Sequence, residues 1–142
     1  MSAINYGRVV VGGLVAGVVL NVLDTVNGLF IIPGEFEANL ARLGLDPALM
    51  QASSVIVTWI IVDFLIGLML VWLYAAIRPR FGPGLKTALI SGVYYWAGVS
   101  AVLYALTAMG VFSSSLFWKT LPLQLVITLA GAAAGGWAYK EA

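Results

Sequence analysis

The fold of this chain is decided by one apolar stretch with a carboxyl group inside it, GLVAGVVLNVLDTVNG at residues 13–28. Its small and polar members follow one another at spacings of four, four, three and four: Gly13, Gly17, Asn21, Asp24 and Gly28. Residues three and four apart share a helix face, so these five form one stripe. The rest of the stretch is mostly Val and Leu, which suit contact with lipid. The stretch therefore predicts a membrane-spanning helix whose stripe of small and polar residues faces other helices.

The composition of the whole chain favours the same environment. Of the 142 residues, 62% are hydrophobic and 9% are charged, whereas soluble domains carry about 25% charged residues. The net charge of +1 gives no reason to expect nucleic acid as a partner. The sequence contains no Cys and no His. We therefore predict no metal site and no cofactor held by thiolate or imidazole ligands, while a non-covalent quinone or carotenoid stays open.

Turn signals divide the chain into four apolar segments, which cover roughly residues 7–32, 48–77, 85–109 and 115–139 and are long enough to cross a bilayer. We predict an all-α membrane protein with a single domain over residues 1–142, built as a four-transmembrane-helix up-and-down bundle. The main breaks fall at Pro33-Gly34, Arg78-Pro79, Gly82-Pro83-Gly84, Gly110 and Ser113.

Two prolines mark helix boundaries less directly. Asp46-Pro47 has the form of an N-cap followed by proline at the first helical position, so we expect it to start the second span. Pro122 lies early in the fourth apolar segment. It either kinks that span or marks its true start.

The first outer loop is predicted to contain a short amphipathic helix over residues 35–43. Phe36, Leu40 and Leu43 recur at i, i+4 and i+7 between polar residues, and Gly44 follows as a stop. Such a helix would lie at the membrane interface. It would serve as a simple lid over the bundle, or as a gate or partner-docking surface.

The distribution of basic residues predicts the orientation. With four spans both termini share a side, and that side carries most of the basic residues: Arg8, Arg78, Arg80, Lys86 and Lys140. The opposite side holds Arg42 and Lys119. The positive-inside rule then places both termini in the cytoplasm and the protein in the cell (inner) membrane. We expect Arg78, Arg80 and Lys86 to contact anionic lipid headgroups.

Glycine stripes on the other spans predict close helix packing. The second span carries Trp59, Asp63, Gly67, Leu70 and Tyr74 at helical spacing, and the fourth carries Thr120, Gln124, Thr128, Gly131 and Gly135. We assign helix packing to five glycines, either within the bundle or in a dimer interface: Gly13, Gly17, Gly67, Gly131 and Gly135. The third span offers two faces, one with Trp96, Ser100, Tyr104 and Thr107 and the other with Ser91, Tyr94 and Gly98.

Depth along the helices places the polar residues in one layer. At the rise of an α-helix, Asp24 lies roughly 24 Å beyond Arg8, and Asp63 lies roughly 22 Å from Arg78. The same count brings Ser100 and Gln124 to about 21 and 24 Å from the basic residues of their own spans. With Asn21 and Tyr104, these residues are our candidates for binding a proton or a ligand.

The two aspartates allow three interpretations. No Lys or Arg is expected at their depth, so we expect at least one carboxyl to be protonated at neutral pH. It could hold the bundle in register by hydrogen bonding, or form a proton, cation or polar-ligand site in a binding or transport cavity. A catalytic dyad is the third interpretation, but no nucleophile or electrophile accompanies it, so no catalytic residue is assigned.

Two parts of the chain resemble known membrane proteins. WLYAAIRPRFGPG at residues 72–84 and the opening YGRVVVGG at residues 6–13 are similar to small uncharacterised four-helix bacterial inner-membrane proteins. Phe36 to Gly44, and Asp63 followed four positions later by Gly67, resemble the DoxX-type family more loosely. That family usually has Glu where this chain has Asp63. Its association with membrane oxidoreductase complexes would imply a redox-linked accessory role.

These patterns favour a non-enzymatic integral membrane protein, an accessory or binding subunit that packs through glycine-rich faces against a membrane partner or an apolar ligand. The partner could be a second copy or a larger complex. One alternative is a small proton- or cation-coupled transporter or channel that uses Asp24 and Asp63. The other is a component of a quinone-linked membrane oxidoreductase, with a flat ring system stacked on the aromatic run at residues 94–96.

Overall fold

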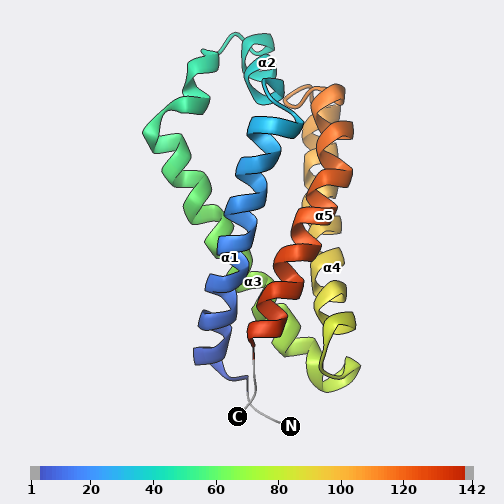
Figure 1. The fold of residues 1–142 in the computed structure, drawn as a ribbon. Helices are drawn as coiled ribbons and strands as arrows, with labels where there is room; N and C mark the ends of the chain where they lie inside the picture. The colour runs from blue at the N-terminus through green and yellow to red at the C-terminus, as the bar shows by residue number, and fades with distance from the viewer. Residues whose placement is uncertain (1–3, 140–142) are drawn as a thin grey trace.

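The computed structural model describes residues 4–139, and within that range every regular element is helical (Figure 1). In chain order these are α1 (Tyr6–Val26), the π-helix η1 (Asn27–Ile31), α2 (Glu35–Arg42), the 3-10 helix η2 (Pro47–Gln51), α3 (Ser53–Phe81), α4 (Leu85–Ala108) and α5 (Ser114–Ala138).

Four of these helices are long and apolar enough to cross a membrane, namely Tyr6–Ile31, Ser53–Phe81, Leu85–Ala108 and Ser114–Ala138. This confirms the predicted all-α class with four apolar spans. The long helices alternate in direction, and α2 covers one end of the bundle (Figure 1). The amide of Asn5 donates to the hydroxyl of Tyr139 at 3.3 Å, so the described chain starts and finishes at the opposite end, here called the terminal end.

Helix α1 packs closely against two of the other long helices. It lies against α3 on one side and α5 on the other, while α4 packs mainly against α5 and less extensively against α3. In Figure 1 the first turns of α3 lie apart from α4 and α5, and α3 approaches α4 only toward its own end. The bundle is therefore closed most tightly at the terminal end.

The contact between α1 and α3 depends on three glycines. A Cβ atom added to Gly67 would lie 2.6 Å from the backbone nitrogen of Gly17. One added to Gly13 would lie 2.5 Å from the side chain of Leu68, and one on Gly17 would lie 2.9 Å from the Cα of Phe64. No Cβ fits at such distances, so the two backbones touch only because these side chains are absent.

Two more glycines bring α5 against the other helices. A Cβ on Gly131 would lie 2.8 Å from Leu20 of α1, and one on Gly135 would lie 2.5 Å from Val71 of α3. All five glycines assigned to helix packing thus lie at contacts inside the bundle. Gly98 of α4 differs, because nothing lies within 4 Å of the place where its Cβ would be.

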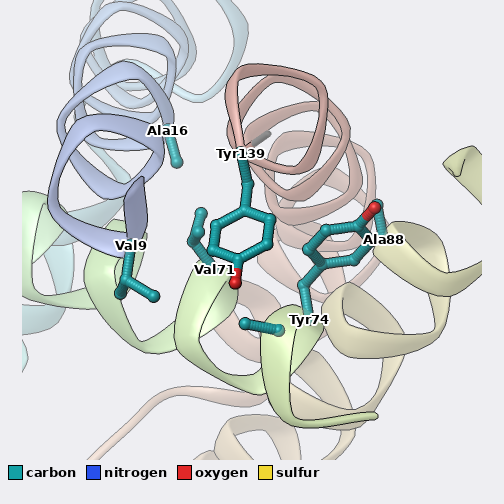
Figure 2. Close-up of a cluster of buried hydrophobic side chains, with 7 residues drawn as sticks. Val9, Ala16, Val71, Tyr74, Ala88 and Tyr139 are labelled. Atoms are coloured by element: carbon teal, nitrogen blue, oxygen red, sulfur yellow. The ribbon is translucent and has the colours of Figure 1, made fainter. Parts of the chain in front are cut away.

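A cluster of buried side chains fills the terminal end between these helices (Figure 2). The rings of Tyr74 and Tyr139 meet edge to face, with centroids 5.8 Å apart. The Tyr74 hydroxyl accepts a hydrogen bond from the amide of Gly84, which ties the α3–α4 turn to the core. The remaining members are Val9, Ala16, Val71, Ala75 and Ala88.

The basic residues expected at the lipid headgroups differ in their surroundings. Arg80 and Lys86 are exposed, whereas Arg78 is half-buried. The guanidinium carbon of Arg78 lies 5.7 Å from the centre of the Tyr139 ring, a cation–π contact with the core. Lys140, the remaining basic residue expected on this side, lies outside the described residues.

Several helix boundaries differ from those expected. Asp46 does cap a helix that starts with Pro47, accepting a hydrogen bond from the amide of Ala48, but this is η2, and α3 begins only at Ser53. Helix α3 also passes Arg78-Pro79 and ends at Phe81. Pro79 has no amide to donate to the carbonyl four residues earlier, yet the helix continues for two more residues, and Gly82, with φ of 83°, supplies the actual stop.

The fourth span begins at Ser114, where the hydroxyl of Ser113 accepts a hydrogen bond from the amide of Leu116. Pro122 therefore lies inside α5 and does not mark its start. The first span also departs from expectation, because its last five residues, Asn27–Ile31, form a π-helix.

The amphipathic helix is present as α2 and is fastened to the loop between α4 and α5. The Arg42 guanidinium donates to the carbonyls of Gly110 and Val111, both at 2.9 Å, and to the side-chain oxygen of Asn39 at 3.0 Å. That same oxygen accepts from the amide of Ser113 at 2.9 Å. These contacts favour the lid interpretation of α2.

Gly67→Ala should destabilise the bundle by about 1–3 kcal/mol, because the added methyl group would overlap the backbone of α1. Gly98→Ala is the matched control, since open space surrounds that position in a helix of the same type. Thermal unfolding in detergent, followed by circular dichroism, measures both. Equal melting temperatures for the two variants would contradict the packing described here.

An ion pair joins α2 to α5, with Lys119 donating to the carboxylate of Glu35. The hydrogen bond and positive charge of Lys119 hold the pKa of Glu35 below its ordinary value of 4.5. Because this pKa is lowered, the ion pair contributes to stability at neutral pH, and that contribution is lost as the pH falls through the lowered pKa.

A carbon-13 titration should show the pKa of Glu35 rising toward 4.5 in Lys119→Met and unchanged in Lys86→Met. A wild-type pKa at or above 4.5 would refute this.

Candidate functional site

One polar side chain from each span converges in the middle of the bundle. The Gln124 side-chain amide on α5 donates to a carboxylate oxygen of Asp24 on α1 at 2.6 Å. Asp63 on α3 lies close enough to Asp24 for their charges to interact, and Tyr95 on α4 lies close enough to interact with both. We call Asp24, Asp63, Tyr95 and Gln124 the acidic layer.

The contact between α1 and α3 at their glycines determines where the two acids lie along the bundle. Asn21 reinforces it, because its side-chain amide donates to the carbonyl of Gly17 at 2.9 Å and to that of Ile60 on α3 at 3.4 Å. Asp24 follows Asn21 by three residues, and Asp63 follows Ile60 by three residues. Because the two helices are antiparallel, Asp24 lies on the α2 side of the Asn21–Ile60 contact and Asp63 lies on its terminal side, near enough for their charges to interact.

Asp63 is the carboxyl group of the layer that has no hydrogen-bond partner among the described residues. Its side chain is buried, with 6% of the residue exposed. Within residues 4–139 it makes no hydrogen bond and no ion pair, and its charge interacts with Asp24 and Tyr95. The residue as a whole is buried, but its carboxyl oxygens are not among the fully enclosed polar atoms of the described range, so they keep access for a donor from elsewhere.

Asn27 extends the polar face toward the α2 end. It is 3% exposed, and its side-chain oxygen has no hydrogen-bond donor within the described part of the chain. Asn27 opens the π-helix η1, and π-helical turns occur frequently at functional sites. Sequence reasoning did not select Asn27, although it follows Asp24 by three residues and so shares its helix face.

The third span contributes a different residue from those expected. Tyr104 is 59% exposed and its ring lies beside Phe117, so it is not part of the layer. Ser100 is half-buried and forms no side-chain hydrogen bond with the described residues. Tyr95 is the residue that α4 contributes to the layer instead, and it packs beside the buried cluster that contains Leu20 and Leu70.

Tyr95 lay on neither of the two faces considered for that span. The sequence feature that could have identified Tyr95 is a set of small residues that precede it by one and two turns on its side of the helix: Ala88, Ser91 and Gly92. All three are buried, and a Cβ on Gly92 would lie 3.2 Å from Ala132 of α5. The close contact with α5 sets the rotation of α4 and turns Tyr95 toward the acids.

A pocket of about 460 Å³ opens on the bundle surface at Tyr95. Its other lining residues are apolar or aromatic and come from α1, α3 and α4: Val9, Leu68, Met69, Trp72, Leu73 and Tyr94. Tyr95 therefore belongs to both the pocket wall and the acidic layer. Neither Asp24 nor Asp63 lines this pocket.

The layer can accept protons or hydrogen bonds and attract positive charge. No ion pair of the described residues involves Asp24 or Asp63. No group of three carboxylates, or of other common metal ligands, gathers anywhere in the described range. The arrangement supplies hydrogen-bond acceptors and negative charge, which suit interaction with a proton, a cation or a hydrogen-bond donor.

Gln124→Leu should destabilise the protein by about 1–3 kcal/mol, because it leaves the Asp24 carboxyl inside the bundle without its donor. Gln51→Leu makes the same chemical change at an exposed site and should be nearly neutral. Denaturant unfolding in mixed micelles compares the two variants. The hydrogen bond across the layer would be refuted if Gln124→Leu were as stable as the wild type.

Comparison of the chain with protein-family models, with curated proteins and with solved structures finds no match. The functional argument therefore depends on the chemistry of the acidic layer.

Proposed function

We propose that this chain is a non-enzymatic integral membrane protein that binds a ligand at the acidic layer. The observation that supports this most directly is the Asp63 carboxyl, which is buried beside Asp24 without a hydrogen-bond partner among the described residues. Such a group is costly inside a membrane protein, and costly intramembrane acids are usually functional. A ligand that donates a hydrogen bond or carries a positive charge would stabilise it.

We further propose that the protein lies in the cell membrane of a bacterium with both termini in the cytoplasm. Arg8, Arg78, Arg80 and Lys86 belong to the terminal end, whereas Arg42 and Lys119 belong to the α2 end. This asymmetry supports the orientation through the positive-inside rule. An accessory role in a larger membrane complex is compatible with the large apolar side chains exposed on all four spans.

A second candidate, proton- or cation-coupled transport, is favoured by Asn27. Its unpaired side-chain oxygen lies one helical turn beyond Asp24 toward the α2 end. Together the two residues would form the start of a polar path from that end to Asp63. Transport would then use the same acids as ligand binding.

Native mass spectrometry of the protein released from mild detergent tests the binding proposal. The wild type should carry an additional bound mass, and Asp24→Asn/Asp63→Asn should lose it, because amides keep the shape of the layer but remove its negative charge. Asp46→Asn alters an exposed acid at the start of η2 and should keep the bound mass. Identical spectra for all three proteins would contradict the proposal.

A further inference from the structure

We infer that α3 and α4 bind one anionic phospholipid at the terminal end, with its headgroup at Arg80 and Lys86 and one acyl chain on each side of Tyr94. This goes beyond the binding proposed at the acidic layer and is independent of it, because neither acid takes part. Three observations support it: two adjoining apolar pockets, two cations on their terminal side, and the depth that separates these cations from Tyr94.

Two pockets adjoin at the side chain of Tyr94. The pocket of about 460 Å³ described above lies between α1, α3 and α4. A second pocket, of about 570 Å³, runs along α4 toward the terminal end, and Tyr94 lines it together with Leu85, Lys86, Leu89, Ile90 and Val93. Tyr94 is 74% exposed, so its ring projects from the helix where the two apolar hollows adjoin. This shape suits two hydrocarbon chains on either side of one ring.

Two basic side chains lie on the terminal side of these pockets. Lys86 lines the second pocket directly. Arg80 follows Leu73 by seven residues, which is about two helical turns, so it shares the α3 face that lines the first pocket. Both are exposed, and neither forms a hydrogen bond or an ion pair with the residues that the structure describes. Their charges are therefore available to a headgroup.

The charge of the terminal end favours an anionic headgroup over a zwitterionic one. Among residues 4–139, each Asp and Glu belongs to the acidic layer, to α2 or to the cap of η2, and none lies at the terminal end. Arg8 is a further exposed cation at that end. A zwitterionic headgroup carries its own positive charge beside the phosphate. An anionic headgroup has net negative charge, which Lys and Arg next to a membrane attract.

The depth of the pockets matches one leaflet of a bilayer. The turn that joins α3 to α4 lies at the same end as the termini (Figure 1). Tyr94 lies eight residues from Lys86 along α4, and Trp72 lies eight residues from Arg80 along α3, which is about 12 Å in each helix. One leaflet has about 15 Å of hydrocarbon, half of a core of about 30 Å. Acyl chains from a headgroup at the two cations would therefore reach and pass Tyr94.

A second copy of the chain fits this face less well than a lipid does. Two copies related by a twofold axis in a bilayer have the same orientation and meet through the same surface. A partner on this face would therefore bring its own Arg80 and Lys86 to the same level, where like charges repel. An anionic lipid offsets these charges instead.

Native mass spectrometry tests the inference on protein released from nanodiscs that contain equal parts of phosphatidylglycerol and phosphatidylcholine with the same acyl chains. The wild type should retain one phosphatidylglycerol at least fivefold more often than phosphatidylcholine. Lys86→Gln and Arg80→Gln should each lower this ratio at least threefold, because each removes a cation from the headgroup site. Lys119→Gln removes an exposed cation near the α2 end and should keep the wild-type ratio.

A pair of tyrosine variants on α4 tests the pockets themselves. Tyr94→Ala removes the ring that both pockets share and should lower the retention of phosphatidylglycerol at least threefold. Tyr104→Ala removes a ring that is 59% exposed on the same helix and lines neither pocket, so retention should not change.

Equal retention of the two lipids by the wild type would overturn the inference, as would a ratio that falls equally in Lys86→Gln and Lys119→Gln. A lipid-free dimer that is lost in Tyr94→Ala would also overturn it, because a second copy would then cover this face. Phosphatidylglycerol should still be retained by Asp24→Asn/Asp63→Asn. Failure of binding at the acidic layer is therefore distinguishable from failure of this inference.

Discussion

The close approach of α1 and α3 is the constraint on which the rest of the structure depends. Gly13, Gly17 and Gly67 remove the side chains that would hold the two backbones apart. Helix α5 then fits against the same pair through Gly131 and Gly135, and α4 completes the bundle against α5. In lipid the hydrophobic effect does not drive helices together, so this close packing carries much of the association energy.

The acidic layer is a consequence of that packing. The crossing of α1 and α3 at the glycines leaves Asp24 and Asp63 near enough for their charges to interact, and Asn21 fastens the crossing through carbonyls of both helices. Gln124 satisfies Asp24, whereas Asp63 has no donor within the described residues. The architecture therefore satisfies one acid with its own residues and leaves the other without a hydrogen-bond partner among the described residues.

Much of this was predictable because long apolar segments and glycine stripes are strong local signals. Depth counted from basic residues also selected Asp24, Asp63 and Gln124, which the structure brings together. The rotation of α4 was not predictable, because small and polar residues lie on several of its faces and the close contact of Gly92 is made with α5. The π-helix at Asn27 likewise has no clear local signal.

The central claim is that the spans meet at the acidic layer within the bilayer, and solid-state NMR tests it most directly. Asp carboxyl carbons labelled with carbon-13 and Gln side-chain nitrogens labelled with nitrogen-15 would be measured in lipid bilayers. A Gln51→Leu background leaves Gln124 as the one glutamine. The hydrogen bond of 2.6 Å predicts strong dipolar dephasing of the Asp24 signal alone. No dephasing of any Asp carboxyl would contradict the account.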